Sequence, residues 1–549
     1  MSIKTGTYIG NDDHQAIEVG FRPEVVIACA VTLEQCGIKI EDFWCGRSNV
    51  LSASDSYISG AKFTDKGFTV GPAATWNKLG TTYHYLALSR SAALKIGFAG
   101  LQGNGQNNRV VKLDDATLTP AAVIAKRDSP RDAILQVGAL TSARLGGVAL
   151  TEAGAITGLA QGQFTVSSSV FVNEYNPAAE LGEGIDFIAF EAGSNFAVAN
   201  YTGTGAAQTV ALPFRPKALL HAKLTGSVVT TGRIKTDTMG SDEAKVVSNG
   251  AALQSAGMTF VAGGLQLTAA SPANTSGDTF VVIAFRDHTE DAIGAPAVKK
   301  AASRSILLPG RTAGSHIDCG TDDSLVIDGA ITLEWMGSIE PVGRATPVPF
   351  LWRGSATTNT AGTCSLALYA NGFVGSPGNW SGPSLCIGCG DRLDLSTASI
   401  GIRSSWRTGL LLEFGKLAHL MATHDGAGGW NFYKNGRLIR QRALNLIGDG
   451  NMPNIDGVSG HRMMIGGMMN GGVAVNNMQR QRFALGRLYS RALTPEEVAS
   501  RFARAGLGST EADITAGLVE EWDARNAIGS VLAATVRPTN NGTIANAVL

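Results

Sequence analysis

A repeated pattern in the first three hundred residues constrains the fold of this chain more than any other feature. Phe-Arg-Pro occurs at 21–23 and again at 214–216, and each copy is followed by an apolar run. A looser copy between them has a proline, Pro120, ahead of a similar run. Pro23, Pro120 and Pro216 are spaced 97 and 96 residues apart. Self-similarity at a fixed period predicts structural units arranged in series.

The copies also end alike. Asn77 and Gly80 precede an apolar strand that starts with an aromatic residue, and Asn274 and Gly277 do so at the same spacing. The middle copy closes at a similar strand, 185–190, after extra residues. Since Asn and Gly tolerate positive φ, Asn-x-x-Gly ahead of a strand predicts a hairpin turn.

The runs behind the three prolines predict buried strands. Proline cannot donate to a strand ladder, so we expect each one at the start of a strand. The runs are continuous rather than alternating, which predicts burial on both faces. With 68 glycines and few long helical patterns, the chain is predicted to be all-β. We expect three tandem β-sandwich-like modules, module 1 at 1–92, module 2 at 93–196 and module 3 at 197–288, with the shared residues as scaffold.

Charge and composition exclude several classes of protein. The 549 residues include 45 basic and 45 acidic side chains, which excludes the electrostatic footprint of a nucleic-acid or polybasic membrane binder. The longest apolar run, Val25 to Leu33, is far too short to span a bilayer. No charged-then-apolar leader follows Met1, so we expect synthesis in the cytoplasm without a signal peptide. Seven cysteines, an odd number, argue against a disulfide framework.

A different domain follows a linker at 289–305. From 306 to 507 the strands alternate more cleanly, as at 331–335, which is typical of a sheet with one face inward. Asn435 and Gly436 lie between two strand-like runs and predict a tight hairpin. Trp430 and Phe432 alternate on that hairpin and are predicted to lie in the core.

A helix is predicted at the close of this domain. Thr494 can cap it, Pro495 suits the first helical position, and Glu497 completes a capping box. Val498 and Phe502 then lie one turn apart, and Gly506 ends the helix.

These motifs resemble the laminin-G-like, concanavalin A-like family. The resemblance covers about 306–507 and rests on four motifs in the family's order, at 331–335, 419–426, 433–436 and 488–497. It implies a two-sheet jelly roll with a short C-terminal helix. It also allows a calcium ion, for which no ligands are assigned in this sequence; no other cofactor is expected. The tail, 508–549, resembles a segment that often opens such a domain, and we expect it to pack on the same sandwich or on a neighbouring subunit.

The modules resemble a repeat of bacteriophage virion proteins. The resemblance rests on Tyr8, Phe21, Pro23, Asn77, Gly80 and Tyr83. It implies a virion structural protein of the tail-fibre, head-fibre or spike type that attaches to the host surface or a glycan through a lectin-like domain. Its expected partners are other virion proteins, a host cell-surface glycan and further copies of itself. The alternatives are a capsid or tail decoration protein that binds no sugar, and a secreted adhesin, against which the missing leader counts.

No catalytic site is predicted. Concanavalin-type glucanases, which the C-terminal domain resembles in fold, carry Glu-x-Asp-x-x-Glu on one strand so that two carboxylates share a face. The nearest approach here is Glu521-Trp-Asp523, where Asn526 replaces the last carboxylate. We therefore expect a protein that is not an enzyme.

Two candidate sites remain. Cys386 and Cys389 have the spacing of half a zinc site, but no second pair follows them, and buried free thiols are the alternative interpretation. Trp380, beside Asn379, lies in a stretch rich in Gly and Pro. We interpret Trp380 and Asn379 as ligand-binding residues, because an aromatic side chain that is hard to bury can serve as a sugar platform; otherwise Trp380 covers a sheet edge.

Overall fold

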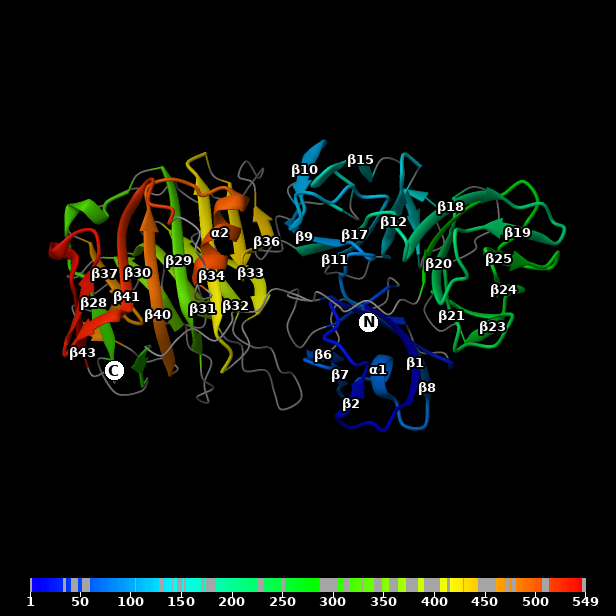
Figure 1. Cartoon of the computed structure of the whole chain (residues 1–549), viewed down its shortest axis with the longest axis horizontal. Coiled ribbons are helices and arrows are strands. Elements are labelled where there is room, and N and C mark those ends of the chain that lie inside the picture. The colour runs from blue at the N-terminus through cyan, green and yellow to red at the C-terminus, as the bar shows by residue number, and fades with distance from the viewer. Residues whose placement is uncertain are drawn as a thin grey trace. The chain divides into compact units, whose positions relative to one another are not determined.

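The computed structural model contains mostly strands (Figure 1), which confirms the all-β prediction. It describes residues 2–32, 36–40, 48–51, 60–103, 105–127, 132–140, 142–145, 151–152, 155–169, 172–173, 184–224, 232–247, 252–286, 305–309, 315–327, 329–339, 348–354, 364–371, 384–389, 405–411, 415–427, 429–442, 461–470, 473–475, 480–505 and 513–545. The chain divides into two compact units, Met1–Asn176 with Gly182–Ala295, and Pro177–Leu181 with Pro296–Leu549. Within the described ranges, no helix is long and apolar enough to cross a membrane.

The first unit repeats one order of strands three times. Module 1 contains β1 Ile3–Ile9, β2 Gln15–Glu18, β3 Val25–Ala30, β4 Cys36–Ile40, β5 Asn49–Val50, β6 Ala61–Thr64, β7 Gly67–Val70, the one-turn helix α1 Ala74–Asn77 and β8 Thr82–Leu88. Module 2 contains β9 Ile96–Gln102, β10 Arg109–Lys112, β11 Ala122–Arg127, β12 Ile134–Val137, β13 Ser142–Arg144, β14 Thr151–Glu152, β15 Ile156–Ala160, β16 Gln163–Val166 and β17 Gly184–Phe190. Module 3 contains β18 Phe196–Thr202, β19 Gln208–Ala211, β20 Ala218–Lys223, β21 Arg233–Thr236, β22 Glu243–Val246, β23 Leu253–Ser255, β24 Met258–Val261, β25 Gly264–Leu267 and β26 Thr279–Phe285.

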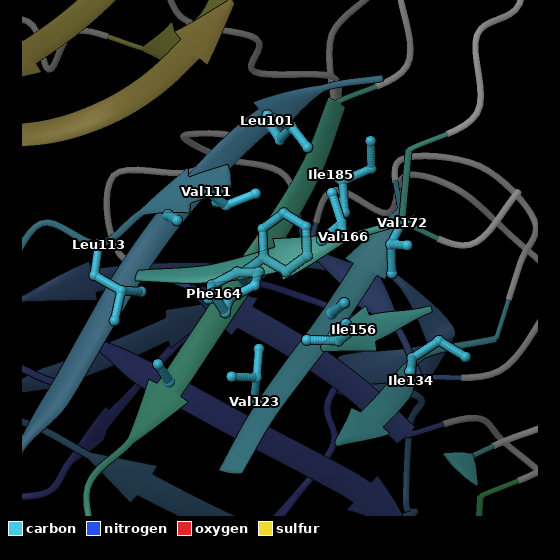
Figure 2. Packing of buried hydrophobic residues seen from close by; sticks show 14 of the residues in the cluster. Leu101, Val111, Leu113, Val123, Ile134, Ile156, Phe164, Val166, Val172 and Ile185 are labelled. Atoms are coloured by element: carbon cyan, nitrogen blue, oxygen red, sulfur yellow. The ribbon is translucent and has the colours of Figure 1, made fainter. Parts of the chain in front are cut away.

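Each module is a sandwich of two sheets with the same connectivity. The larger sheets run β1-β8-β3-β4-β5, β9-β17-β11-β12-β13-β14 and β18-β26-β20-β21-β22-β23. The smaller sheets run β2-β7-β6, β10-β16-β15 and β19-β25-β24. Figure 2 shows the core of module 2, where Phe164 of the small sheet packs among Val123 and Ile185 of the large one. The register therefore identifies equivalent positions in all three copies.

The strand behind each proline is central and buried. All six residues of β3, of β11 and of β20 are buried, as the continuous apolar runs predicted. Each strand has a paired neighbour on both sides, so its backbone groups are satisfied within the sheet.

The Asn-x-x-Gly segments differ in part from the prediction. Gly80 and Gly277 have φ of 70° and 80°, so the positive φ predicted for the glycines is confirmed. The hairpin is wrong, because the segment joins β7 of the small sheet to β8 of the large one. Asn77 ends the helical turn α1 and acts through its side chain.

That side chain fixes the loop between the first two strands of a module. Asn77 Oδ1 accepts hydrogen bonds from Asn11 N (3.0 Å) and Gln15 Nε2 (2.6 Å). Asn274 Oδ1 accepts the equivalent bonds from Thr204 N (3.0 Å) and Gln208 Nε2 (2.5 Å). The asparagine recurs in both copies because its buried side chain accepts the hydrogen bonds of this loop, not because of its backbone angles.

The three modules form a ring, and two of its three junctions use equivalent contacts. Ala133 N, just before β12, donates to Leu51 O, just after β5 (2.9 Å); Gly232 N, just before β21, donates to Leu145 O, just after β13 (3.0 Å). Module 3 meets module 1 where Leu253 N donates to the carbonyl oxygen of Val31 (3.0 Å), the residue after β3. One chain thus builds a closed ring of three similar modules, which the sequence alone did not predict.

Aromatic side chains fill the junction of modules 2 and 3. Phe190 and Phe285 end the equivalent strands β17 and β26, and Phe196 begins β18. The ring centroids are 4.9 Å apart for Phe190 and Phe196, and 5.3 Å for each of these with Phe285. All three are buried, so the modules share apolar surface as well as hydrogen bonds.

One disulfide is present that the cysteine count did not predict. Cys29 and Cys36 are directly paired on β3 and β4 and form a disulfide. An odd total of cysteines excludes complete pairing but not one bridge, and the hairpin between two neighbouring strands brings these two together.

The second unit is a larger sandwich that carries a helix. Its elements are β27 Ile306–Leu308, β28 His316–Asp318, the 3-10 turn η1 Asp323–Leu325, β29 Ala330–Ile339, β30 Val348–Gly354, β31 Cys364–Asn371, β32 Ser384–Cys389, β33 Ser405–Leu411, β34 Ala418–Asp425, β35 Trp430–Lys434, β36 Arg437–Arg442, β37 Arg462–Ile465, β38 Met468–Asn470, β39 Val473–Val475, β40 Gln481–Tyr489, α2 Pro495–Ala505, β41 Leu518–Ile528, β42 Val531–Ala534, the 3-10 turn η2 Pro538–Asn540 and β43 Gly542–Ala545.

Two layers of strands enclose its core. One layer runs β36-β35-β34-β29-β40-β41, with β27 also on β40. The other runs β28-β37-β30-β31-β32-β33. Trp335 of β29 stacks on Phe350 of β30, with 4.2 Å between ring centroids, and both are buried. The tail supplies β41 to this sandwich, and β42 and β43 continue from it to β28.

The local predictions that fall on described residues at the end of this domain are confirmed, while Gly506, predicted to end the helix, lies outside the described residues. Asn435 and Gly436 have φ of 52° and 78°, as a tight hairpin requires. Thr494 N donates to Glu497 Oε2 (2.9 Å) and Glu497 N donates to Thr494 Oγ1 (3.3 Å), which is the predicted capping box. Trp430 and Phe432 are buried in the core.

Candidate functional site

The predicted ligand-binding residues, Trp380 and Asn379, lie outside the described residues. The strands on either side of them are described: Asn371 at the end of β31 pairs with Ser384 at the start of β32. The assignment of Trp380 and Asn379 stays a prediction.

The neighbouring strands end at the same place. Val348, which begins β30, pairs with Ala370 of β31. Leu411, which ends β33, pairs with Ser384 of β32. These ends of β30 to β33 are therefore neighbours in one sheet.

The predicted metal ligands lie on one of these strands. Cys386 and Cys389 are paired with Tyr369 and Leu366, so both belong to the extended part of β32. Three residues of strand separate the two Cα atoms by about 10 Å, whereas a zinc knuckle brings two thiolates together across a turn. The described residues contain no group of three or more His, Cys, Asp or Glu side chains that could hold a metal. The cysteine pair stays a prediction.

Cys319 does not extend that pair into a described metal site. It is buried and free, and burial together with the carboxylates of Asp318 and Glu520 raises the pKa of its thiol well above the ordinary value. A thiol that keeps its proton is a poor metal ligand and a poor nucleophile. Cys319 is therefore a small core residue.

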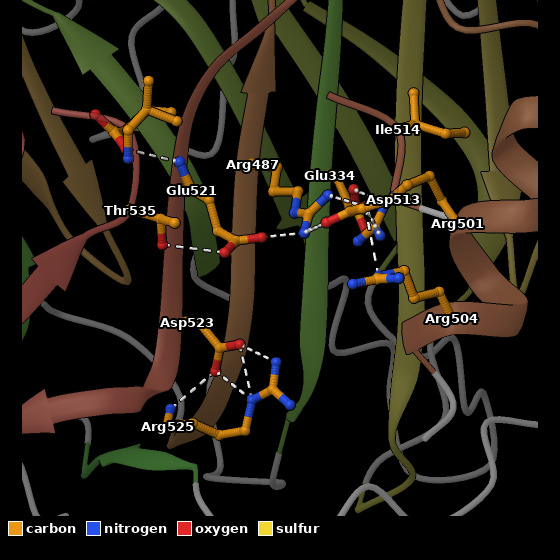
Figure 3. A network of polar contacts seen from close by, with 12 residues as sticks. Glu334, Arg487, Arg501, Arg504, Asp513, Ile514, Glu521, Asp523, Arg525 and Thr535 are labelled. Atoms are coloured by element: carbon orange, nitrogen blue, oxygen red, sulfur yellow. Dashed lines mark hydrogen bonds and ion pairs between the residues drawn. The ribbon is translucent and has the colours of Figure 1, made fainter. Parts of the chain in front are cut away.

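The carboxylates nearest to the glucanase pattern are engaged with other side chains (Figure 3). Glu521 Oε2 forms an ion pair with Arg487, and Glu521 Oε1 accepts a hydrogen bond from Thr535 Oγ1 (3.0 Å). Asp523 accepts hydrogen bonds from Arg525 N (2.8 Å) and Arg525 Nε (2.8 and 2.9 Å to its two oxygens). Neither carboxylate stands free to meet a sugar.

Glu521 belongs to a larger polar network that sequence reasoning missed. Glu334, buried on β29, accepts hydrogen bonds from Arg501 Nη2 (2.9 Å) and Arg501 Nε (3.2 Å) of α2. Asp513 accepts from Arg501 Nη1 (2.8 Å) and from both Nη atoms of Arg487 on β40 (3.0 and 2.9 Å). The alternation at 331–335 predicted a strand with one face inward, which is wrong for β29, because every residue from 331 to 339 is buried and Glu334 is paired there.

The electrostatics show that the network holds ionised groups. Burial alone would raise the pKa of Glu334, but the charge of Arg501 and the hydrogen bond from His419 Nε2 (2.9 Å) outweigh it. The pKa of Glu334 therefore lies well below its usual range. The ion pairs join α2 and the residues leading to β41 to the centre of one sheet, which is a structural role.

Comparison with known proteins gives only distant matches. No protein-family model and no curated protein matches the sequence. Similar solved structures include the sialidase carbohydrate-binding module CBM40 of Ruminococcus gnavus bound to α2,3-sialyllactose, at 13% identity over 37% of this chain and 97% of that one, with a TM-score of 0.26. A candidate carbohydrate-binding protein of Bacteroides ovatus matches at 12% identity over 64% and 92%, with a TM-score of 0.28. The binding domain of Paraclostridial Mosquitocidal Protein 1 matches at 16% identity over 37% and 44%, with a TM-score of 0.26.

Proposed function

We propose that this chain is a non-enzymatic structural protein of a bacteriophage particle, of the tail-fibre, head-fibre or spike type, and that its C-terminal sandwich attaches to a glycan on the host surface. The virion setting comes from the resemblance of the three modules to a phage repeat. The glycan comes from the lectin-like motifs of the sandwich and from Trp380 in the 372–383 connection. Fold alone would not assign either role.

One observation carries the non-enzymatic part of the proposal. Both oxygens of Glu521, the carboxylate closest to the glucanase pattern, are engaged, one by Arg487 and one by Thr535. A glycosidase needs two carboxyl groups that face the scissile bond. A sandwich whose carboxylates bind its own side chains is better suited to binding a sugar than to hydrolysing one.

Binding of the full chain to an array of bacterial O-antigens and capsular polysaccharides tests the glycan role. We expect wild type to bind one class of polysaccharide, and Trp380→Ala to weaken that binding about tenfold or more because a central aromatic contact is lost. Trp380→Phe is the matched control, since it keeps an aromatic platform, and we expect it to retain most of the affinity. Equal binding by Trp380→Ala, or release of sugar products from the bound polysaccharide, would contradict the proposal.

A second function, decoration of a capsid or tail without sugar recognition, is favoured by exposed apolar side chains on the sandwich. Ile528, Val531 and Val536 are 81%, 44% and 42% exposed on or beside the β41–β42 hairpin. Ile528 and Val531 are directly paired on β41 and β42, and paired apolar side chains at a surface suit a protein partner.

Sedimentation of the tagged chain with purified phage capsids or tails separates the two functions. If decoration is correct, Ile528→Asp together with Val531→Asp abolishes co-sedimentation, while Val110→Asp, which alters an exposed apolar residue of module 2, leaves it intact. Polysaccharide binding without co-sedimentation leaves the host-attachment role as the better proposal.

A further inference from the structure

The disulfide occurs in only one of three equivalent hairpins. Cys29 and Cys36 pair across β3 and β4 of module 1. The register places Lys126 and Ala133 at the same positions of module 2, and Ala222 and Gly232 at those of module 3. Modules 2 and 3 form the same hairpin without a bridge, so the module fold does not require one.

The bridged hairpin carries the contact that closes the ring. Directly after β3, the carbonyl oxygen of Val31 accepts a hydrogen bond from Leu253 N (3.0 Å), and that of Thr32 accepts one from Lys245 Nζ (2.5 Å). Both donors belong to module 3. Short chain segments join module 1 to module 2 and module 2 to module 3, but no covalent link other than the path through module 2 joins module 3 to module 1.

Two further contacts lie on the same interface. Thr5 Oγ1 of β1 donates to Asp237 Oδ1 of module 3 (2.5 Å). The Nδ1 atom of His84 on β8 lies 2.8 Å from Thr238 Oγ1. The interface between modules 1 and 3 is therefore polar, and polar contacts at a partly exposed surface open more readily than a packed core.

We propose that the Cys29–Cys36 disulfide is a redox-controlled latch that holds module 1 closed on module 3. Oxidation transfers two electrons and two protons from the thiols to a small-molecule disulfide: one S–S bond forms between Cys29 and Cys36, the bond of the reagent breaks, and two small thiols leave. The bridge holds the ends of the hairpin together, so Val31 and Thr32 stay in position for their donors. Reduction frees the hairpin and weakens the closing contact.

Burial couples the latch to the ring. Cys29 and Cys36 are 1% and 3% exposed, so a thiol reagent reaches the bridge only when the surrounding structure opens. The coupling is reciprocal, as linkage requires: the bridge favours the closed ring, and the closed ring protects the bridge.

The first test measures how fast reduced glutathione opens the disulfide in the native full chain, by alkylation of free thiols and mass spectrometry. The opening variant is Thr5→Val with Thr238→Val, which removes two hydroxyl groups of the module 1–3 interface and keeps side-chain shape. The matched control is Thr117→Val with Thr204→Val, whose hydroxyl groups bond to Asp115 Oδ1 and Ala206 O within their own modules. We expect reduction of the opening variant to be about tenfold faster than wild type, since two hydrogen bonds are lost, and the control to match wild type. Equal rates in all three proteins would overturn the proposal.

The second test needs no variant. Amide hydrogen exchange of the oxidised and reduced wild-type chain should differ at Leu253, whose amide donates across the interface, and not at Gly232, whose amide donates between modules 2 and 3. Faster exchange at Leu253 after reduction supports the latch. Unchanged exchange there, or an equal increase at both amides, overturns it.

Discussion

Arg501 of α2 donates two hydrogen bonds to the carboxylate of Glu334, which lies buried in the middle of β29. The pair fixes the helix to the sheet at a point that is 167 residues away along the chain. Removing Arg501 leaves the buried carboxylate with the hydrogen bond from His419 but without the guanidinium that donates to it. Removing one partner of a buried ion pair is strongly destabilising.

Arg501→Met should therefore destabilise the sandwich. We expect the free energy of unfolding to fall by about 3 kcal/mol, measured by chemical denaturation with tryptophan fluorescence. Arg504→Met is the matched control on the same helix, because Arg504 is 38% exposed and lies 3.5 Å from Asp513. Its loss should cost at most about 1 kcal/mol, and equal effects of the two substitutions would count against the role of Glu334.

The same carboxylate predicts an acid limit of stability. The folded pKa of Glu334 is well below the ordinary value of 4.5, so its contribution is complete above that pH and is lost as pH falls toward the folded pKa. The melting temperature of the sandwich should thus decline as the pH drops below 4.5. Glu334→Gln has no proton to gain at this position, so its melting temperature, lower at pH 7, should converge on that of wild type in acid; parallel curves would contradict the assignment.

Asn77 and Asn274 should contribute equally to the stability of modules 1 and 3. Asn77→Ala and Asn274→Ala each remove a buried side chain and leave part-buried donors of the first loop without an acceptor, and we expect each to cost about 2 kcal/mol of unfolding free energy. Asn107→Ala removes one exposed acceptor, for Ser168 N, and should cost less than about 1 kcal/mol. Equal losses of unfolding free energy for all three variants would contradict the role of Asn77 and Asn274 in fixing the first loop.

Two glycines are required by close packing rather than by their backbone angles. A Cβ atom on Gly10 would lie 2.1 Å from Lys78 O, and one on Gly203 would lie 2.1 Å from Thr275 O. Gly10→Ala and Gly203→Ala should therefore destabilise modules 1 and 3, by about 2 kcal/mol or more. Gly193→Ala meets its nearest atom, Ala93 O, at 3.5 Å and should leave the melting temperature nearly unchanged.

Removal of the tail should unfold part of the sandwich. Truncation after Gly508 deletes β41, the buried Trp522 and the Asp513 carboxylate that binds Arg487 and Arg501. We expect a lower melting temperature or loss of the sandwich transition in calorimetry. Truncation after Ala545 keeps all these contacts and serves as the control; a melting curve of the 508 truncation that matched it would contradict the role of the tail.

The sequence predicted the elements whose signals are local. The buried strands behind Pro23 and Pro216, the Asn435-Gly436 turn and the capping box of Thr494 and Glu497 depend on residues within a few positions of one another. Alternation, turn chemistry and capping act over that range, so one sequence is enough to identify them.

What could not be predicted depends on contacts between distant segments. The residues next to Asn77 do not predict that its side chain will accept a hydrogen bond from Gln15. No spacing in the sequence predicts the ion pair between Glu334 and Arg501. The number of cysteines does not predict the disulfide, because an odd total describes the whole chain. The pairing of Cys29 with Cys36 depends on one hairpin. The predicted sites at Trp380 and at Cys386 and Cys389 stay predictions.

The ring of modules has a consequence for how such a protein can change. A ring made of three identical chains would dissociate on dilution. Each mutation would also occur in all three chains. Here translation sets the number of copies, so the assembly holds together at any concentration, and a substitution enters only one position at a time. Module 1 could thus acquire a disulfide that modules 2 and 3 lack.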